Sequence, residues 1–149
     1  MAHQTTQSVV VGSDVKTVYT IWSNFENFPH FMENIKSVTK IGDTLSHWVM
    51  SGPLGFNVEW DAETTRMEEN ARIAWNSRDN STITTSGQVT FTELPNSQTE
   101  VTVTLQYEPP AGIAGDIVAK VFSNPETRLA EDLQNFKRYA EGIHKTVNS

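Results

Sequence analysis

The four histidines are the first side chains to consider as chemical groups, because an imidazole can bind a metal ion or move a proton near neutral pH. They are His3, His30, His47 and His144, and no two of them stand four residues apart. No carboxylate accompanies them at the spacing of a ligand motif. A zinc or iron site needs at least three converging ligands, so the pattern predicts solvated or singly hydrogen-bonded histidines and no metal. If turned inward, His30 or His47 could act as an acid or a base.

Glu59, Asp61 and Glu63 form an acidic series that could transfer protons. They alternate with apolar residues along a predicted strand, which places them on its wet face. Nothing raises the pKa of a solvated carboxylate, so we interpret the series as surface. The serines are not part of a G-x-S-x-G motif, and no glycine-rich nucleotide motif is present. The sequence therefore predicts no cofactor and leaves the catalytic residues unknown.

Large apolar side chains remain as candidates for a binding site. Aromatic residues usually fill a core, but some must line a cavity if the chain forms one. Tyr107 also carries a hydroxyl that could orient a carbonyl group. The predicted lining residues come from the middle of the sheet, from the covering helix and from the mouth: Trp60, Trp75, Phe91, Tyr107, Phe122, Phe136, Phe28 and Phe31.

Length and charge exclude several classes of protein. The 149 residues fit one domain, 1–149, with room for a core or a pocket. A net charge of -7 argues against nucleic-acid binding, which needs a dense basic surface. The absence of cysteine excludes disulfides and thiolate metal sites. Neither a signal sequence nor a stretch of about 18 apolar residues is present, so we expect a cytoplasmic protein without a transmembrane segment.

The elements that must position these side chains are mainly strands. We expect a first strand at 5–11, and then two short helical segments that end near Met32. Period-two alternation predicts six further strands, joined by short turns that are typical of antiparallel neighbours. Only the strand around Trp48 is ambiguous, because Leu45, His47 and Val49 compete with Trp48 and Met50 for the inside. The six strands are expected at 35–41, 44–51, 56–67, 72–78, 86–93 and 100–108.

A long amphipathic element follows the strands. Steps of four and three residues place an apolar stripe on one side of a helix that begins near Pro125. A shorter stripe upstream, from Ile113 to Phe122, leaves open whether there are two helices or one helix kinked at the proline. The main stripe consists of Leu129, Leu133, Phe136, Ala140, Ile143 and Val147.

An amphipathic sheet and one long amphipathic helix bury their apolar faces by packing together. The sequence therefore predicts an α+β fold in which a curved antiparallel sheet of about seven strands wraps around the C-terminal helix. A strongly curved sheet contacts a straight helix over only part of its inner face. Large side chains or a ligand must fill the remaining space.

Several short motifs stand along the chain: His47-Trp48, Gly52-Pro53-Leu54-Gly55, Val58-Glu59-Trp60-Asp61-Ala62, Ile73-Ala74-Trp75 with Ser77, Gly87-Gln88-Val89-Thr90-Phe91, Tyr107-Glu108-Pro109-Pro110, and Glu131-Asp132-Leu133 with Phe136-Lys137. Together they resemble the bacterial polyketide cyclase/dehydrase proteins of the START-like (SRPBCC) superfamily. The resemblance implies a helix-grip fold and a relation to coenzyme Q-binding proteins. Both binders and enzymes are built on this fold.

Three functions are compatible with this pattern. The first is binding of a hydrophobic small molecule, such as a polyketide, an isoprenoid, a quinone or another lipid, with entry past residues 25–32 or 109–115. The second is a polyketide cyclase or dehydratase, in which the pocket folds a flexible substrate and a hydroxyl or imidazole moves a proton. The third is an interaction or stress-related domain with a filled core. The oligomeric state does not follow from the sequence.

Overall fold

A computed structural model describes residues 3–51, 57–78, 84–108 and 125–148 of the chain. Within these ranges, strands and short helices come first and one long helix comes last, as the sequence predicts. The elements are β1 (His3–Val11), α1 (Val15–Ser23), the 3-10 helix η1 (Phe25–His30), β2 (Ile35–Lys40), β3 (Leu45–Ser51), β4 (Asn57–Glu68), β5 (Arg72–Ser77), β6 (Thr84–Leu94), β7 (Gln98–Glu108) and α3 (Pro125–Asn148).

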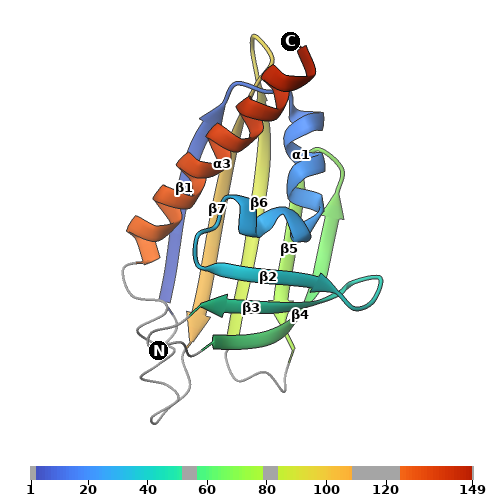
Figure 1. Cartoon of the computed structure of the whole chain (residues 1–149), viewed down its shortest axis with the longest axis vertical. Helices are drawn as coiled ribbons and strands as arrows, with labels where there is room; N and C mark the ends of the chain where they lie inside the picture. The colour runs from blue at the N-terminus through green and yellow to red at the C-terminus, as the bar shows by residue number, and fades with distance from the viewer. Residues whose placement is uncertain (1–2, 52–56, 79–83, 109–124, 149) are drawn as a thin grey trace.

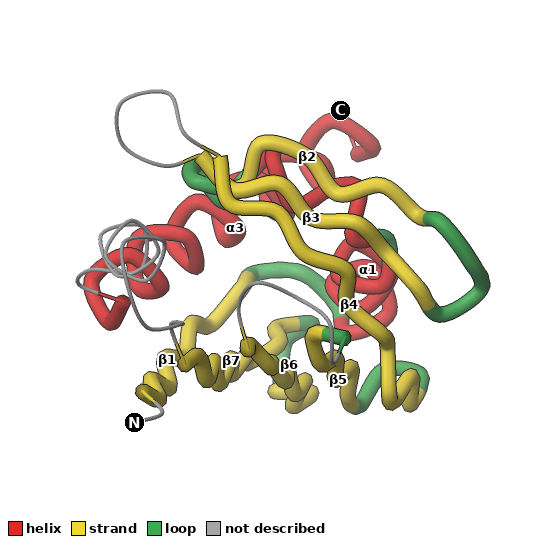
Figure 2. The backbone as a smooth tube through the Cα atoms, turned by 90° about the horizontal axis from the view of Figure 1, so that it is seen from below, coloured by secondary structure: helices red, strands yellow, loops and turns green. Residues whose placement is uncertain are grey.

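The described strands form one antiparallel sheet in the order β1-β7-β6-β5-β4-β3-β2. Figure 1 shows β1, β7, β6 and β5 along the long axis of the molecule, with β2 and β3 crossing them. Seen from below, in Figure 2, β2, β3 and β4 lie opposite β1, β7 and β6. The sheet is therefore strongly curled, and it has an inside and an outside.

The bend of the sheet is concentrated in β4. The first half of this strand pairs with β3 and the second half with β5. The register shifts between Thr64 and Arg66, which leaves Thr65 as an extra residue. Such a bulge bends its strand and increases the local twist. The bulge therefore lies where the crosswise half of the sheet turns into the lengthwise half.

The alternation expected from the sequence is confirmed in the described strands. On β4, Val58, Trp60 and Ala62 are buried, whereas Glu59 and Glu63 are exposed. The ambiguity at β3 is resolved because Trp48 is 4% exposed and faces inward. Phe56, which was expected to continue this inner row, lies outside the described residues.

The two short helices between β1 and β2 each begin at an N-cap side chain. The Asp14 side chain accepts a hydrogen bond from the backbone of Thr17 and begins α1. The Asn24 side chain accepts one from the backbone of Glu26 and begins η1. Residues three apart are eclipsed in a 3-10 helix, so Phe25 and Phe28 enter the core from the same side.

The long helix α3 begins at Pro125, as its N-terminal signal predicts. Its stripe is buried at Leu129, Leu133, Phe136 and Ala140, each at most 2% exposed. The side chains of Ile143 and Val147 lie outside the described part. So do residues 109–124, and with them the choice between two helices and one kinked helix.

Polar contacts join α3 to the end of β1. Lys137 Nζ donates to the carbonyl of Val10 at 3.0 Å, and Glu141 accepts from the backbone N–H of Gly12 at 2.7 Å. Lys137 and Glu141 also form an ion pair, one helical turn apart, at 2.6 Å. The helix is thus held against β1 both by its apolar stripe and by this pair.

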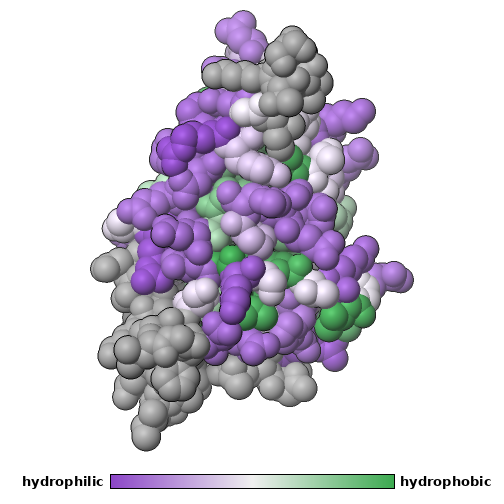
Figure 3. All heavy atoms as spheres, viewed as in Figure 1, coloured by the Kyte–Doolittle hydropathy of each residue, from purple (hydrophilic) through white to green (hydrophobic). Residues whose placement is uncertain are grey.

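The surface is mostly polar on the face shown in Figure 3, with small separate apolar areas. Across the described residues, no helix combines the length and the apolar character that a membrane span requires. The curled sheet closing on α3, with short helices after β1, confirms the predicted helix-grip architecture.

Candidate functional site

The space between the sheet and α3 is occupied, in the described part, by a continuous cluster of aromatic rings. The rings contact one another at centroid distances of 5.0 to 6.3 Å. Such edge-to-face and offset contacts add to the stabilisation from burial. The aromatic cluster consists of Trp22, Phe25, Phe28, Phe31, Trp48, Trp60, Trp75 and Phe136.

Strand register brings the three sheet tryptophans together. Trp48 on β3 is paired directly with Trp60 on β4, and their rings stack at 5.8 Å. Trp75 on β5 lies 6.1 Å from Trp48, with the two ring planes 23° apart. Trp75 also lies over Gly87, its cross-strand partner, where an added Cβ would be 2.3 Å from the indole. A glycine at this position therefore leaves the room that the indole occupies.

The structure describes seven of the eight predicted lining residues. Trp60, Trp75, Phe28, Phe31 and Phe136 belong to the aromatic cluster. Phe28 and Phe31, expected at a mouth, are 0% and 2% exposed and stand in the middle of the core. Phe28 on η1 and Phe31 directly after it therefore both point into the core, and their contact with a ligand stays a prediction.

Of the other three predicted lining residues, two lie in the described part of the chain. Phe91 contacts Tyr19 of α1 at 5.6 Å. Tyr107 stands near the end of β7, where burial raises the pKa of its hydroxyl. Phe122 lies outside the described residues. Phe91 belongs to the same buried hydrophobic core as the aromatic cluster. That the eight predicted residues line one ligand site stays a prediction.

The inner face is less completely covered toward the ends of β3 and β7. Met50 and Leu105 are apolar, pack against the core and are only half-buried. Thr5 lies opposite Leu105 in the register of β1 and β7. Its hydroxyl is buried and has no hydrogen-bond partner among the described residues. Together with Tyr107, Thr5 offers a hydroxyl at this end of the inner face.

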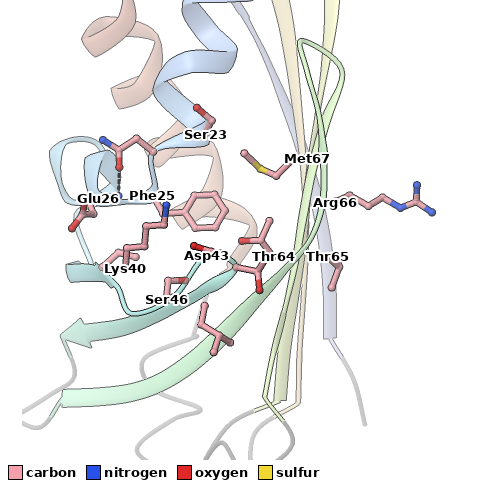
Figure 4. A pocket seen from close by; sticks show the side chains of 15 residues that line it. Ser23, Phe25, Glu26, Lys40, Asp43, Ser46, Thr64, Thr65, Arg66 and Met67 are labelled. Atoms are coloured by element: carbon pink, nitrogen blue, oxygen red, sulfur yellow. Dashed lines mark hydrogen bonds between the residues drawn. The ribbon is translucent and has the colours of Figure 1, made fainter.

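A cavity of about 500 Å³ opens beside the aromatic cluster rather than inside it (Figure 4). Its walls are the turn between α1 and η1, the β2–β3 hairpin and the bulge of β4. Sequence reasoning missed this cavity, because its walls are three segments that only the strand register brings together. The turn signal at Gly42-Asp43 was its only visible trace in the sequence.

His47 makes two hydrogen bonds, whereas the sequence predicts solvated or singly hydrogen-bonded histidines. Its Nδ1 lies 2.8 Å from Asp61 Oδ1 and its Nε2 lies 2.9 Å from Glu59 Oε1. The hydrogen bond to Asp61 and that to Glu59 raise the pKa of His47. Together they outweigh burial, which acts to lower it. All three side chains lie on the outer face of the sheet. Glu59 and Asp61 are therefore surface residues, as expected, and His47 does not point inward.

The described residues hold no group of three or more histidine, cysteine or carboxylate side chains arranged to bind a metal ion. His30 is exposed and stacks on Tyr139 of α3 at 5.5 Å. Neither His30 nor His47 therefore faces the interior as an acid or a base.

Asp132 is the acid with the most altered titration. It lies mostly buried on α3, where burial raises its pKa to about 7, against the opposing effect of a backbone hydrogen bond from Glu33. The nearby charges of Glu131 and Glu33 act in the same direction as burial, and that of Arg128 acts against it. The hydrogen bond from Glu33 thus places Asp132 against the loop between η1 and β2.

A curled sheet that closes on one long helix, with an apolar interior and short helices after the first strand, defines a helix-grip protein of the START-like superfamily. The chain belongs to the family "Polyketide cyclase / dehydrase and lipid transport", whose model matches residues 11–134.

Relatives agree with this assignment. An uncharacterized 17.2 kDa protein of Streptomyces lincolnensis is 32% identical over 135 residues, which cover 91% of this chain and 87% of the relative. A crystal structure from Deinococcus radiodurans is 33% identical, covers 91% of this chain and 95% of its own, and has a TM-score of 0.75. The Zhui aromatase/cyclase of a Streptomyces species, at 14% identity and a TM-score of 0.71, shares the fold over 95% and 94% of the two chains.

Proposed function

We propose that this protein binds a hydrophobic small molecule between the sheet and α3. One observation carries the proposal: among the described residues, the fully buried side chains include no aspartate, glutamate, histidine, lysine or arginine. The buried polar residues are Thr5, Ser13, Ser46 and Thr99. Such an interior offers apolar burial and few catalytic groups, as ligand pockets commonly do. Membership of a family that includes lipid transport supports the same proposal.

The ligand contacts the less covered end of the inner face in this proposal. There, Met50 and Leu105 provide half-buried apolar surface. The hydroxyl of Thr5, which is buried and has no hydrogen-bond partner among the described residues, can pair there with one carbonyl or hydroxyl of the ligand. An apolar body with a polar group at one end fits polyketides, isoprenoids, quinones and other lipids alike.

The alternative, a cyclase or dehydratase, needs polar side chains that converge in the space between the sheet and α3. The buried polar residues are dispersed instead. Thr99 donates to the carbonyl of Ser13 at 2.8 Å next to the cap of α1, and Ser46 accepts from Trp48 at the far side of the core. This dispersal favours a carrier or sensor over an enzyme.

Native mass spectrometry of protein purified from its own host tests the proposal. We expect a bound small molecule that denaturation releases. A Leu105→Phe variant should lose it, because the larger ring fills the half-buried end. Val10→Phe is the matched control, since Val10 is 40% exposed on the outer face of β1. Empty protein that takes up no lipophilic probe would instead indicate a domain whose own aromatic rings fill the interior.

A further inference from the structure

The cavity beside the aromatic cluster is separate from the space between the sheet and α3. Phe25 forms the partition: it lines the cavity, and it also contacts Phe28, Trp48 and Trp75 of the cluster at 5.0, 5.8 and 5.6 Å. Its side chain is 9% exposed. A molecule in this cavity therefore touches the outer side of Phe25, whereas a ligand of the interior touches the rings beyond it.

The walls of the cavity are partly apolar. Phe25, Val38, Leu45 and Met67 all line it. Met67 is 50% exposed, which is unusual for a large apolar side chain, and Figure 4 shows it directed from β4 toward the cavity. A volume of about 500 Å³ lies in the range of pockets that hold small organic molecules.

Hydrogen-bond donors stand among these apolar walls. Ser46 is 6% exposed, and its oxygen already accepts a hydrogen bond from Trp48 Nε1 at 2.9 Å. The hydroxyl hydrogen of Ser46 is therefore left to donate to an acceptor in the cavity. Thr64, on the opposite wall, brings a second hydroxyl.

The charged residues that line the cavity indicate which kind of hydrogen-bond acceptor a ligand would carry. Lys40 extends toward Phe25 in Figure 4, and it forms no ion pair with the described residues. Glu26 and Arg66 also line the cavity but are directed away from it, whereas Asp43 lies at its rim. The cavity walls thus include one ammonium group and two hydroxyls as hydrogen-bond donors, opposed by one carboxylate at the rim.

We propose that this cavity is a second binding site, which takes a small molecule with an apolar body and a carboxylate head. The body packs against Phe25, Leu45 and Met67, and the carboxylate accepts hydrogen bonds from Lys40 and Ser46. This site is independent of the ligand proposed for the interior, because its walls share no residue with the less covered end of the inner face.

Methionine methyl groups provide a direct test with octanoate as the probe. Met67 reports on the cavity, whereas Met32 and Met50 report on the core. In protein labelled with ¹³C at the methionine methyls, octanoate should shift the Met67 signal saturably, and Met67→Leu identifies that signal. The neutral analogue 1-octanol should bind about fivefold or more weakly, since it lacks the charge-assisted hydrogen bonds.

Variants at the rim make the assignment specific. Lys40→Met should weaken octanoate about fivefold and leave 1-octanol unchanged, and Asp43→Asn should tighten octanoate about twofold by removing repulsion. Lys36→Met is the matched control, because Lys36 is an exposed lysine of the same strand that does not line the cavity.

Three results would overturn the proposal: no saturable shift of Met67 at millimolar octanoate, a shift confined to Met32 and Met50, or equal weakening by Lys36→Met and Lys40→Met. Failure here leaves the interior proposal standing, because Leu105→Phe tests that one with a different reporter. Conversely, an empty interior does not alter the response expected at Met67.

Discussion

At the scale of single residues, the absence of a side chain at Gly87 makes room for the indole of Trp75. An added Cβ at Gly87 would lie 2.3 Å from Trp75, a distance that real Cβ atoms essentially never show. The indole of Trp75 is held on its other side by Phe25 and Trp48, so it has little freedom to shift. The packing of the aromatic cluster thus depends on a residue that contributes no side chain to it.

We expect Gly87→Ala to lower the free energy of unfolding by about 1–3 kcal/mol, because it overpacks the cluster. Gly142→Ala is the matched control. Apart from its chain neighbours and the helix's own backbone, no atom of the described part lies within 4 Å of an added Cβ there. Alanine also favours the helix by about 1 kcal/mol, so this variant should be more stable. Urea unfolding of both variants checks the opposite signs. Equal effects would contradict the role of Gly87.

His47 provides a pH-dependent contribution on the outer face. Its hydrogen bonds to Asp61 and Glu59 raise its pKa in the folded protein. The resulting stabilisation is fully present below the unfolded pKa, near 6.5, and is lost as the pH rises through the folded pKa. Because the side chain is 37% exposed, the contribution should stay below about 1 kcal/mol.

Unfolding of the wild type and of His47→Gln at pH 5.5 and pH 8.5 tests this. The stability difference between the two proteins should be larger at pH 5.5 and should shrink at pH 8.5. An NMR titration of His47 in Glu59→Gln should give a lower pKa than in the wild type. A pKa that is unchanged by this substitution would rule out the contact with Glu59 as a cause.

At the scale of elements, α3 is docked by two kinds of contact. Its apolar stripe packs on the core, and Asp132 accepts a backbone hydrogen bond from Glu33 in the loop between η1 and β2. Burial raises the pKa of Asp132 to about 7, well above its ordinary value of 3.8. An acid whose pKa is raised by folding binds more protons in the folded state, so stability falls as the pH rises from about 4 to about 7.

Asp132→Asn should remove this pH dependence, because asparagine keeps an acceptor for the N–H of Glu33 and carries no charge. A pKa shift of this size corresponds to about 4 kcal/mol when the charge is fully expressed. We therefore expect the variant to be more stable than the wild type at pH 8 and nearly equal to it at pH 4. Thermal unfolding at the two pH values measures the effect. A variant that is less stable at pH 8 would contradict it.

At the scale of the whole molecule, the aromatic cluster connects every layer. Trp22 comes from α1, Phe28 from η1, Trp48 and Trp75 from the sheet and Phe136 from α3. If any one of these elements detached from the core, aromatic rings buried by the others would become exposed. That the chain 1–149 is one domain remains a prediction, and this connection makes it testable.

We expect the protein to unfold in a single cooperative transition. Tryptophan fluorescence reports on the cluster, because all four tryptophans are at most 6% exposed, and far-ultraviolet circular dichroism reports on the sheet and α3. The two urea transitions should coincide. Separate midpoints would indicate that part of the chain folds independently of the cluster.

Local pattern alone was enough to predict the element order, the inner and outer faces of the strands and the buried stripe of α3. These features follow from periods of two and 3.6 residues, which neighbouring residues carry by themselves. The face of β3 could not be predicted, because both of its rows are partly apolar. Pairing with β4, which stacks Trp48 on Trp60, decided it.

Contacts between distant segments were decided only by the tertiary structure. His47 meets Asp61 because β3 and β4 pair in one register, and a slip of one residue would separate them. The cavity exists because the bulge at Thr65 bends β4 toward the β2–β3 hairpin and the start of η1. Register and bulge depend on how whole strands pack together, so no short stretch of sequence contains them.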